Sequence, residues 1–222
     1  MSRFPWIVWL FFVGATPALA EWSLIGSLNS EVVHRGASEA DGEPAAGLVV
    51  EWNGQAGWFS GIQAYVASAS PVPGRTRGAG VYGGWFHTLG DQQALELSIS
   101  HQYFEGDFPR DWNYSEARLD FHFSRDFAVT AAVSDDYYGR GESSLLGAFR
   151  WRRPLSRNRH LLVGAGAIGR PGDDLAFAEL GLGASFGLVE AALTLHHINN
   201  SHAHLLHSDR STVSLKLSYP FR

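Results

Sequence analysis

The residues best suited to chemistry in this 222-residue chain are histidines close to its C-terminus. Half of the ten histidines fall in one short stretch: His196, His197, His202, His204 and His207. Neutral imidazole is the commonest metal ligand. His202 and His204, which are separated by one residue, could therefore converge on one ion. No Asp/Glu triad is placed to complete such a site, and only Asp209 is close in sequence. The pattern favours a polar surface loop, and we predict neither a metal site nor a cofactor.

Composition narrows the classes of fold and partner. The chain is 45% hydrophobic, 18% charged and 13% aromatic, with 25 Gly, one Met and no Cys. Without cysteine there is no disulfide framework, thiolate zinc site or iron–sulfur cluster. The net charge of −5 indicates no nucleic-acid partner, since phosphate binding needs a basic face. Scarce helix formers beside abundant glycine and aromatic residues predict an all-β protein.

The first 20 residues have the pattern of a cleaved signal peptide. Arg3 supplies the positive start, Trp6–Val13 the apolar core, and Ala18–Ala20 the small-residue cleavage site. This apolar run is far shorter than the ~20 residues of a spanning helix, which disfavours an uncleaved anchor. We therefore predict a signal peptide over 1–20 and one β domain over 21–222.

The rest of the chain alternates with period two, as β-strands do. In 113–123, Leu119 and Phe121 lie on one face, whereas Arg118 and Asp120 lie on the other. The pattern predicts twelve strands, at 22–33, 44–53, 56–66, 78–88, 92–104, 113–123, 126–134, 143–153, 159–169, 174–185, 187–197 and 211–221.

Short and long connections alternate between these strands. Asn53-Gly54 has the signature of a two-residue hairpin, whereas Pro71–Arg77 and Ser201–Arg210 are long. An even strand number with short turns at one end and longer loops at the other is typical of bacterial outer-membrane barrels. We predict an antiparallel transmembrane β-barrel of about twelve strands, with Asn53-Gly54 periplasmic and the two long loops extracellular.

Aromatic residues gather beside the short turns, as in the girdle of a membrane barrel. They are Trp22, Trp52, Trp58, Trp85, Phe86, Phe123, Phe127, Phe149, Trp151, Phe186, Tyr219 and Phe221.

Charges on the polar strand faces indicate a wet interior, or lumen. Such charges would be costly in a dry core but cost little against water. The candidate lumen-lining residues are Glu96, Glu116, Arg118, Asp120, Arg150, Arg152, Glu179 and Glu190. Because this set contains both acidic and basic residues, the sequence does not indicate whether cations or anions would be preferred. The interpretation is a narrow channel for a small solute or ion, with outer-membrane lipid and the barrel-insertion machinery as partners.

A run of motifs resembles a known family. Ser30–Asp41, with Arg35-Gly36 at its centre, resembles the opening signature of TorF-type porins, a proteobacterial outer-membrane family. Further matches follow in order at Pro44-Ala45, Gly57–Gly61, Asn113–Glu116, Ser134–Gly139 and the closing Leu217–Phe221. The chain departs from the family at Glu31-Val32, His34 and Arg222. The resemblance implies an outer-membrane barrel, and it supplies no catalytic residue.

Two other functions remain as alternatives. Lipid A deacylases carry His-x-Ser-Asn before the last strand, but His196–Asn199 lacks that serine, and Ser201 is displaced by two residues. Outer-membrane phospholipase needs a Ser/His pair facing lipid, and the sequence indicates no convincing pair. We predict that the protein is not an enzyme; the other alternative is a non-conducting structural or adhesion barrel.

Overall fold

A computed structural model describes residues 21–35, 37–39, 43–67, 77–105, 113–137, 141–171, 174–200 and 210–221. Several predicted features lie outside the described residues: the signal peptide at 1–20, Gly36, loop residues 71–76 and 201–209, and His202, His204 and His207. Within the described ranges, no helix is long and apolar enough to cross a membrane.

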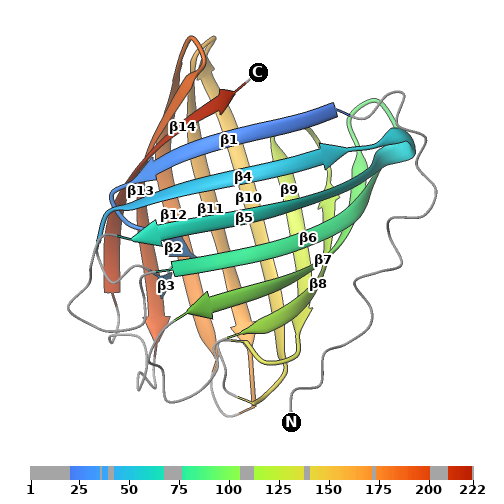
Figure 1. Cartoon of the computed structure of the whole chain (residues 1–222), viewed down its shortest axis with the longest axis vertical. Helices are drawn as coiled ribbons and strands as arrows, with labels where there is room; N and C mark the ends of the chain where they lie inside the picture. Colours follow the sequence, from blue (N-terminus) through green and yellow to red (C-terminus); the bar gives the residue numbers. More distant parts are fainter. Residues whose placement is uncertain are drawn as a thin grey trace.

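The protein is a closed antiparallel β-barrel (Figure 1). Its twelve strands are β1 (Glu21–Asn29), β4 (Ala45–Asn53), β5 (Trp58–Ala67), β6 (Arg77–Thr88), β7 (Ala94–Glu105), β8 (Tyr114–His122), β9 (Phe127–Ser134), β10 (Ser144–Ser156), β11 (Arg159–Gly169), β12 (Leu175–Phe186), β13 (Val189–Asn200) and β14 (Arg210–Phe221). The first strand closes the barrel on the last, with Leu24 opposite Phe221. In Figure 1, β1 and β4–β7 cross β10–β13 at a steep angle, because tilted strands on opposite walls lean in opposite directions. The predicted twelve-stranded barrel is confirmed.

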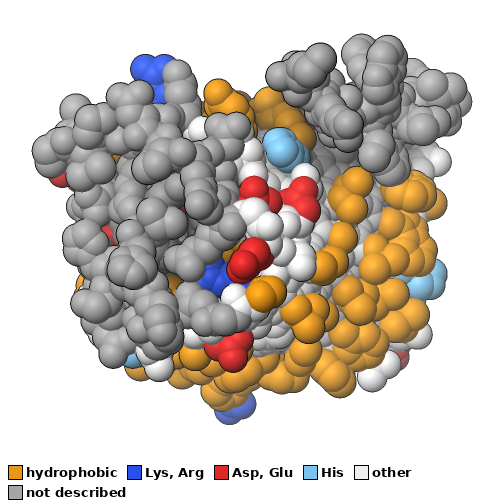
Figure 2. Space-filling model, turned by 90° about the horizontal axis from the view of Figure 1, so that it is seen from below, with side chains coloured by type: hydrophobic (Ala, Val, Ile, Leu, Met, Phe, Trp, Pro, Cys, Tyr) orange, Lys and Arg blue, Asp and Glu red, His pale blue; other side chains and the backbone are white. Residues whose placement is uncertain are grey.

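Period-two alternation sorts every strand into an inner and an outer face. In β8, Asp120 is 3% exposed and points inward, whereas its neighbour Leu119 is 39% exposed and points outward. Residues directly opposite each other in antiparallel strands share a face, so the register extends this assignment around the barrel. The large exposed hydrophobic residues are mostly on the outer face, as a bilayer-facing surface requires. Figure 2 shows hydrophobic side chains over one flank and acidic side chains gathered towards the middle.

The short connections lie at one end of the barrel, as predicted, but the first is not a two-residue turn. Between β4 and β5 the chain forms a 3₁₀ turn at Gln55–Gly57. Its left-handed residues are Ala56 and Gly57, with φ of 57° and 85°, and not the Asn53-Gly54 pair. The indole of Trp85 donates to the Ala56 carbonyl at 2.9 Å, which stabilises this longer turn.

The first strand also ends earlier than predicted, at Asn29 instead of residue 33. The following segment forms a second, two-stranded sheet, β2 (Val33–His34) with β3 (Ala37–Ser38). Arg35 at its turn has a positive φ of 52°. The predicted loop at 34–43 thus contains part of a short hairpin, here called the β2–β3 hairpin, which folds into the lumen.

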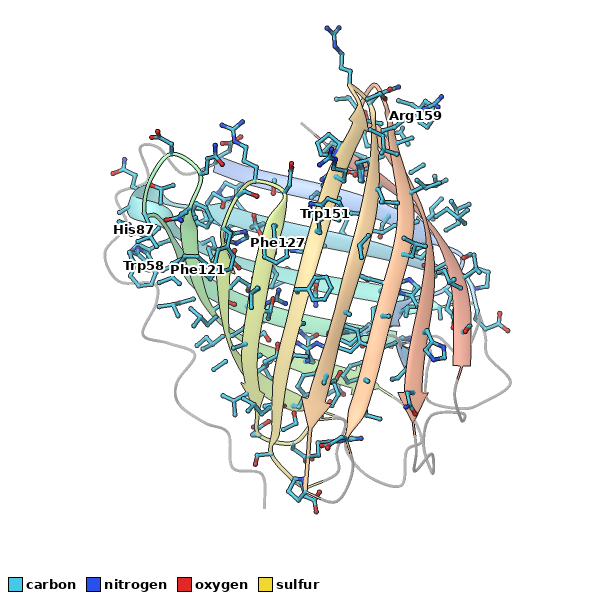
Figure 3. All side chains as sticks on the ribbon, turned by 180° about the vertical axis from the view of Figure 1, so that it is seen from behind. Trp58, His87, Phe121, Phe127, Trp151 and Arg159 are labelled. Atoms are coloured by element: carbon cyan, nitrogen blue, oxygen red, sulfur yellow. The ribbon has the colours of Figure 1, made fainter. Side chains whose placement is uncertain are left out.

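An aromatic girdle surrounds the end that carries the short turns. Trp22 is paired with Trp52 and Trp58 with Trp85 across neighbouring strands. Phe121, Phe127 and Trp151 continue the girdle around the wall (Figure 3). One predicted member is wrong: Phe86 lies opposite the inward-facing Glu96, so its ring points into the lumen.

Candidate functional site

The eight predicted lumen residues occupy inward positions of the barrel register. Glu96 lies opposite Asp120, Arg118 opposite Ser98 and Glu116 opposite Ser100. On the other wall, Arg150 lies opposite Gly164, Arg152 opposite Leu162, Glu179 opposite His196 and Glu190 opposite Ser218. A role of these side chains in solute passage stays a prediction.

Arg118 and Asp120 form a fixed ion pair on the inner face of β8. Two guanidinium nitrogens of Arg118 donate to the two carboxylate oxygens of Asp120, at 2.5 and 2.7 Å. The Thr130 hydroxyl from β9 donates to the same carboxylate at 2.5 Å. A bidentate, hydrogen-bonded pair of this kind is rigid, so these two charges largely cancel at this point of the wall.

The β2–β3 hairpin is fastened to the barrel wall through Arg35. Its guanidinium donates to Glu116 of β8 at 2.7 Å, and both side chains are only 8% exposed. The guanidinium carbon also lies 5.5 Å from the ring centre of Tyr137, a buried residue of the β9–β10 connection. Burial acts to lower the pKa of Arg35, but the contacts with Tyr137 and Glu116 outweigh it and raise the pKa above its usual value. The guanidinium therefore stays charged.

Part of the interior is dry, a feature that the polar strand faces did not predict. Near the end with the longer loops, inward-facing residues form an apolar cluster: Tyr114, Ala132, Tyr137, Leu146, Ile168, Leu175 and Ile198. Ile168 is 1% exposed at the centre of this packing. The rings of Tyr114 and Tyr137 meet edge to face, with centres 5.1 Å apart. The cluster fills one side of the barrel mouth and positions Tyr137 beside Arg35.

The open space lies along the opposite wall, on β4–β8, as a polar cavity of about 560 Å³. Arg35 and His34 of the hairpin border it, as do the predicted residues Glu96, Glu116 and Arg118. Sequence reasoning missed its other main residues, which are Glu51, Phe59, Gln63, Tyr82, Phe86 and Gln102. Of these residues, Glu51 could have been found from the sequence, because it is the single charged residue of β4.

At the short-turn end, Arg152 and Glu190, two of the predicted lumen residues, lie together beside His160. Arg152 lies 3.2 Å from both Glu190 and His160 Nδ1, and His160 Nε2 lies 3.6 Å from Glu190. His160 is buried although Arg152 and Glu190 are exposed. This network is separate from the polar cavity.

The two described histidines of the C-terminal group point to opposite faces. His196 is inward and bonded to Ser214 at 2.9 Å, whereas His197 is outward and bonded to Ser211 at 3.0 Å. They cannot share one ion. Among the residues that the structure describes, no group of three or more acidic or histidine side chains could hold a metal.

Two outward Ser–His pairs do exist, although the sequence indicated no convincing pair. His197 is bonded to Ser211, and His101 Nδ1 lies 3.1 Å from the Ser115 hydroxyl. In both pairs the two residues lie directly opposite each other on neighbouring strands. The sequence of a single strand does not reveal such pairs, because they depend on how the two strands are aligned. In the described part of the chain, no further side chain is hydrogen-bonded to either imidazole, so the orienting third group of a catalytic triad is lacking.

Comparison with known proteins identifies the fold. No family model matches the sequence, and no curated protein matches it. A KdgM porin in complex with disordered oligogalacturonate superimposes with a TM-score of 0.59 at 10% identity, over 91% of this chain and 100% of the porin. The NanC porin gives 0.56 at 9% identity, over 91% of this chain and 100% of that one.

The COG4313 outer membrane channel from Pseudomonas putida F1 gives a TM-score of 0.52 at 10% identity, over 90% of this chain and 95% of the channel. At such low identity these similarities establish the fold alone. The chain has the fold of outer-membrane porins and channels, in keeping with the predicted outer-membrane barrel.

Proposed function

We propose that the protein is a narrow outer-membrane channel for small hydrophilic solutes or ions. The observation that carries this proposal is the charged cavity inside a closed barrel whose outer face is apolar. Twelve strands lie between small barrels filled by side chains and wide porins. The apolar cluster and the β2–β3 hairpin narrow the passage further.

The remaining parts of this assignment rest on sequence. Residues 1–20 would direct export and be removed, and residues 21–222 would then be inserted by the barrel-insertion machinery with lipid around them. The ordered motifs from Ser30 onward support membership of the TorF-type porins. The fold neighbours bear the names of porins and channels, which supports a non-enzymatic role.

Single-channel recording in planar lipid bilayers tests the proposal. The refolded protein is expected to give small, discrete conductance steps, and Arg35→Ala is expected to enlarge them by releasing the hairpin from Glu116. Heat-modifiable mobility on gels serves as the control for correct barrel folding. The absence of conductance in both folded proteins would contradict a channel and favour the structural or adhesion barrel.

Epitope tags test the orientation. Tags in loop residues 71–76 and 201–209 are expected to be labelled on intact cells, whereas a tag at Asn53-Gly54 is expected to stay inaccessible. Strong labelling of the Asn53-Gly54 tag on intact cells would reverse the orientation.

A further inference from the structure

The polar cavity on β4–β8 carries an uncompensated negative charge. Four of the charges around it cancel in pairs, because Arg35 is bound to Glu116 and Arg118 to Asp120. Two carboxylates remain, those of Glu51 and Glu96. The charge of Glu96 is partly offset by His122 at 3.9 Å and by Arg150, which acts on it from outside the cavity lining. Among the described residues no cation is paired with Glu51, so the cavity keeps a net negative charge centred on that carboxylate.

Glu51 is held in place by neutral donors. The Tyr82 hydroxyl donates to one of its oxygens at 2.8 Å, and the Asn53 amide donates to the other at 3.0 Å. These bonds fix the orientation of the carboxylate but do not neutralise it. Glu51 is thus a positioned anion that faces open space.

Aromatic rings and uncharged polar groups complete the same cavity. The rings of Phe59 and Tyr82 have their centres 6.3 Å apart, and Phe86 lies on the same wall. Ring faces attract cations through their quadrupole. The Gln63 amide donates to Gln102 at 3.3 Å, and both amides offer hydrogen bonds to hydroxyl groups.

We propose that this cavity is a binding subsite for a small hydroxylated organic cation, such as a protonated amino sugar. The amine would lie between the Glu51 and Glu96 carboxylates and the aromatic rings, with the hydroxyls against the glutamine amides. A cavity of about 560 Å³ is in the range of small-ligand pockets. A sugar acid of the same size would be repelled by the Glu51 carboxylate and by the net negative charge of the cavity. The inference rests on the proposed channel function for solute access.

Solute block of single-channel current tests this subsite with three probes of similar size: glucosamine, glucose and glucuronate. Glucosamine is expected to block at the lowest concentration and glucuronate at the highest. Glu51→Gln and Glu96→Gln keep the side-chain shape, and each is expected to raise the half-blocking concentration of glucosamine about fivefold, the factor for one solvated charge contact. Glucose block is expected to stay unchanged in both variants.

Glu179→Gln is the matched control, because Glu179 is an inward carboxylate outside the cavity, 3.8 Å from His196. It is expected to leave glucosamine block unchanged. Equal block by the three probes, tightest block by glucuronate, or equal effects of Glu179→Gln and Glu51→Gln would overturn the subsite. If no current is found, the channel proposal fails separately, and calorimetric titration of the folded protein with the same probes and variants still decides the subsite.

Discussion

The inner surface of this barrel consists of two unlike regions. The polar cavity on β4–β8 is lined by carboxylates, amides and rings, whereas the apolar cluster near the longer loops excludes water around Ile168. Outward positions everywhere must suit lipid, but inward positions are free to be wet or dry. The dry region can therefore serve as a support, because it holds Tyr137 against Arg35, while the wet region provides the open space.

The largest expected effect on folding comes from inserting a charge into the dry region. Ile168→Asp would bury a carboxylate among Leu146, Leu175 and Ile198, a cost of several kcal/mol without a partner. We expect it to prevent folding, as assayed by heat-modifiable mobility. Ile168→Ala gives a measurable version, with a loss of about 2–5 kcal/mol in the free energy of unfolding.

The matched substitution in the wet region is Ser98→Asp, on the polar cavity. We expect its free energy of unfolding to stay within about 0.5 kcal/mol of the wild type. Similar losses for Ile168→Asp and Ser98→Asp would show that the interior does not divide into a dry and a wet region.

The second effect concerns Glu116, which stands where the two regions meet. Removing one member of a buried ion pair costs about 3–5 kcal/mol if the other stays buried. Arg35 is on the short β2–β3 hairpin, so its guanidinium can move into water when its partner is removed. We therefore expect Glu116→Gln to detach the hairpin from the wall and to raise the single-channel conductance without unfolding the barrel.

A double-mutant cycle sharpens this prediction. Because Arg35 and Glu116 act through one contact, Arg35→Ala combined with Glu116→Gln is expected to change conductance no more than either substitution alone. Additive increases from the two substitutions would mean that the contact does not hold the hairpin.

A smaller effect is expected within the wet region, at the Arg118–Asp120 pair. Arg118→Leu leaves an uncompensated carboxylate and should shift ion preference towards cations, whereas Asp120→Asn frees the guanidinium and should shift it towards anions. The reversal potential across a salt gradient measures both shifts. Shifts of equal sign in the two variants would contradict a common ion path along this wall.

The sequence predicts the barrel because its outer face obeys one rule. Outward positions such as those of Leu119, Leu193 and Leu217 must all hold apolar residues. The alternation of these residues with polar neighbours indicates where the strands lie, which residues face outward and which connections are short or long. The inner regions obey no such rule. Most strands of the apolar cluster contribute a single inward residue, such as Leu146 or Ile198, so that no single strand shows a dry interior.

The hairpin and the rest of the cavity escaped prediction for related reasons. Arg35 belongs to a recognisable motif, but its partner Glu116 is 81 residues away, and only the closed fold brings them together. The position of Phe86 just before a short turn predicts a place in the girdle, whereas its register places its ring inside the barrel. Proximity in sequence to a turn does not determine which face a residue occupies.

The smallest expected effect is on the outward Ser–His pairs, which lie on the face opposite to both inner regions. Ser211→Ala and Ser115→Ala each remove the hydroxyl bonded to an imidazole. A cross-strand polar pair contributes about 0.2–1 kcal/mol, so we expect a slight loss of stability and no change in lipid composition. Mass spectrometry of outer-membrane lipids compares the wild type, Ser211→Ala, Ser115→Ala, the inner-facing control Ser214→Ala and a strain without the protein. Loss of a deacylated lipid product in Ser211→Ala alone would make His197 a general base and establish the lipid-modifying enzyme, because the inner-facing Ser214→Ala changes the same chemical group without reaching lipid.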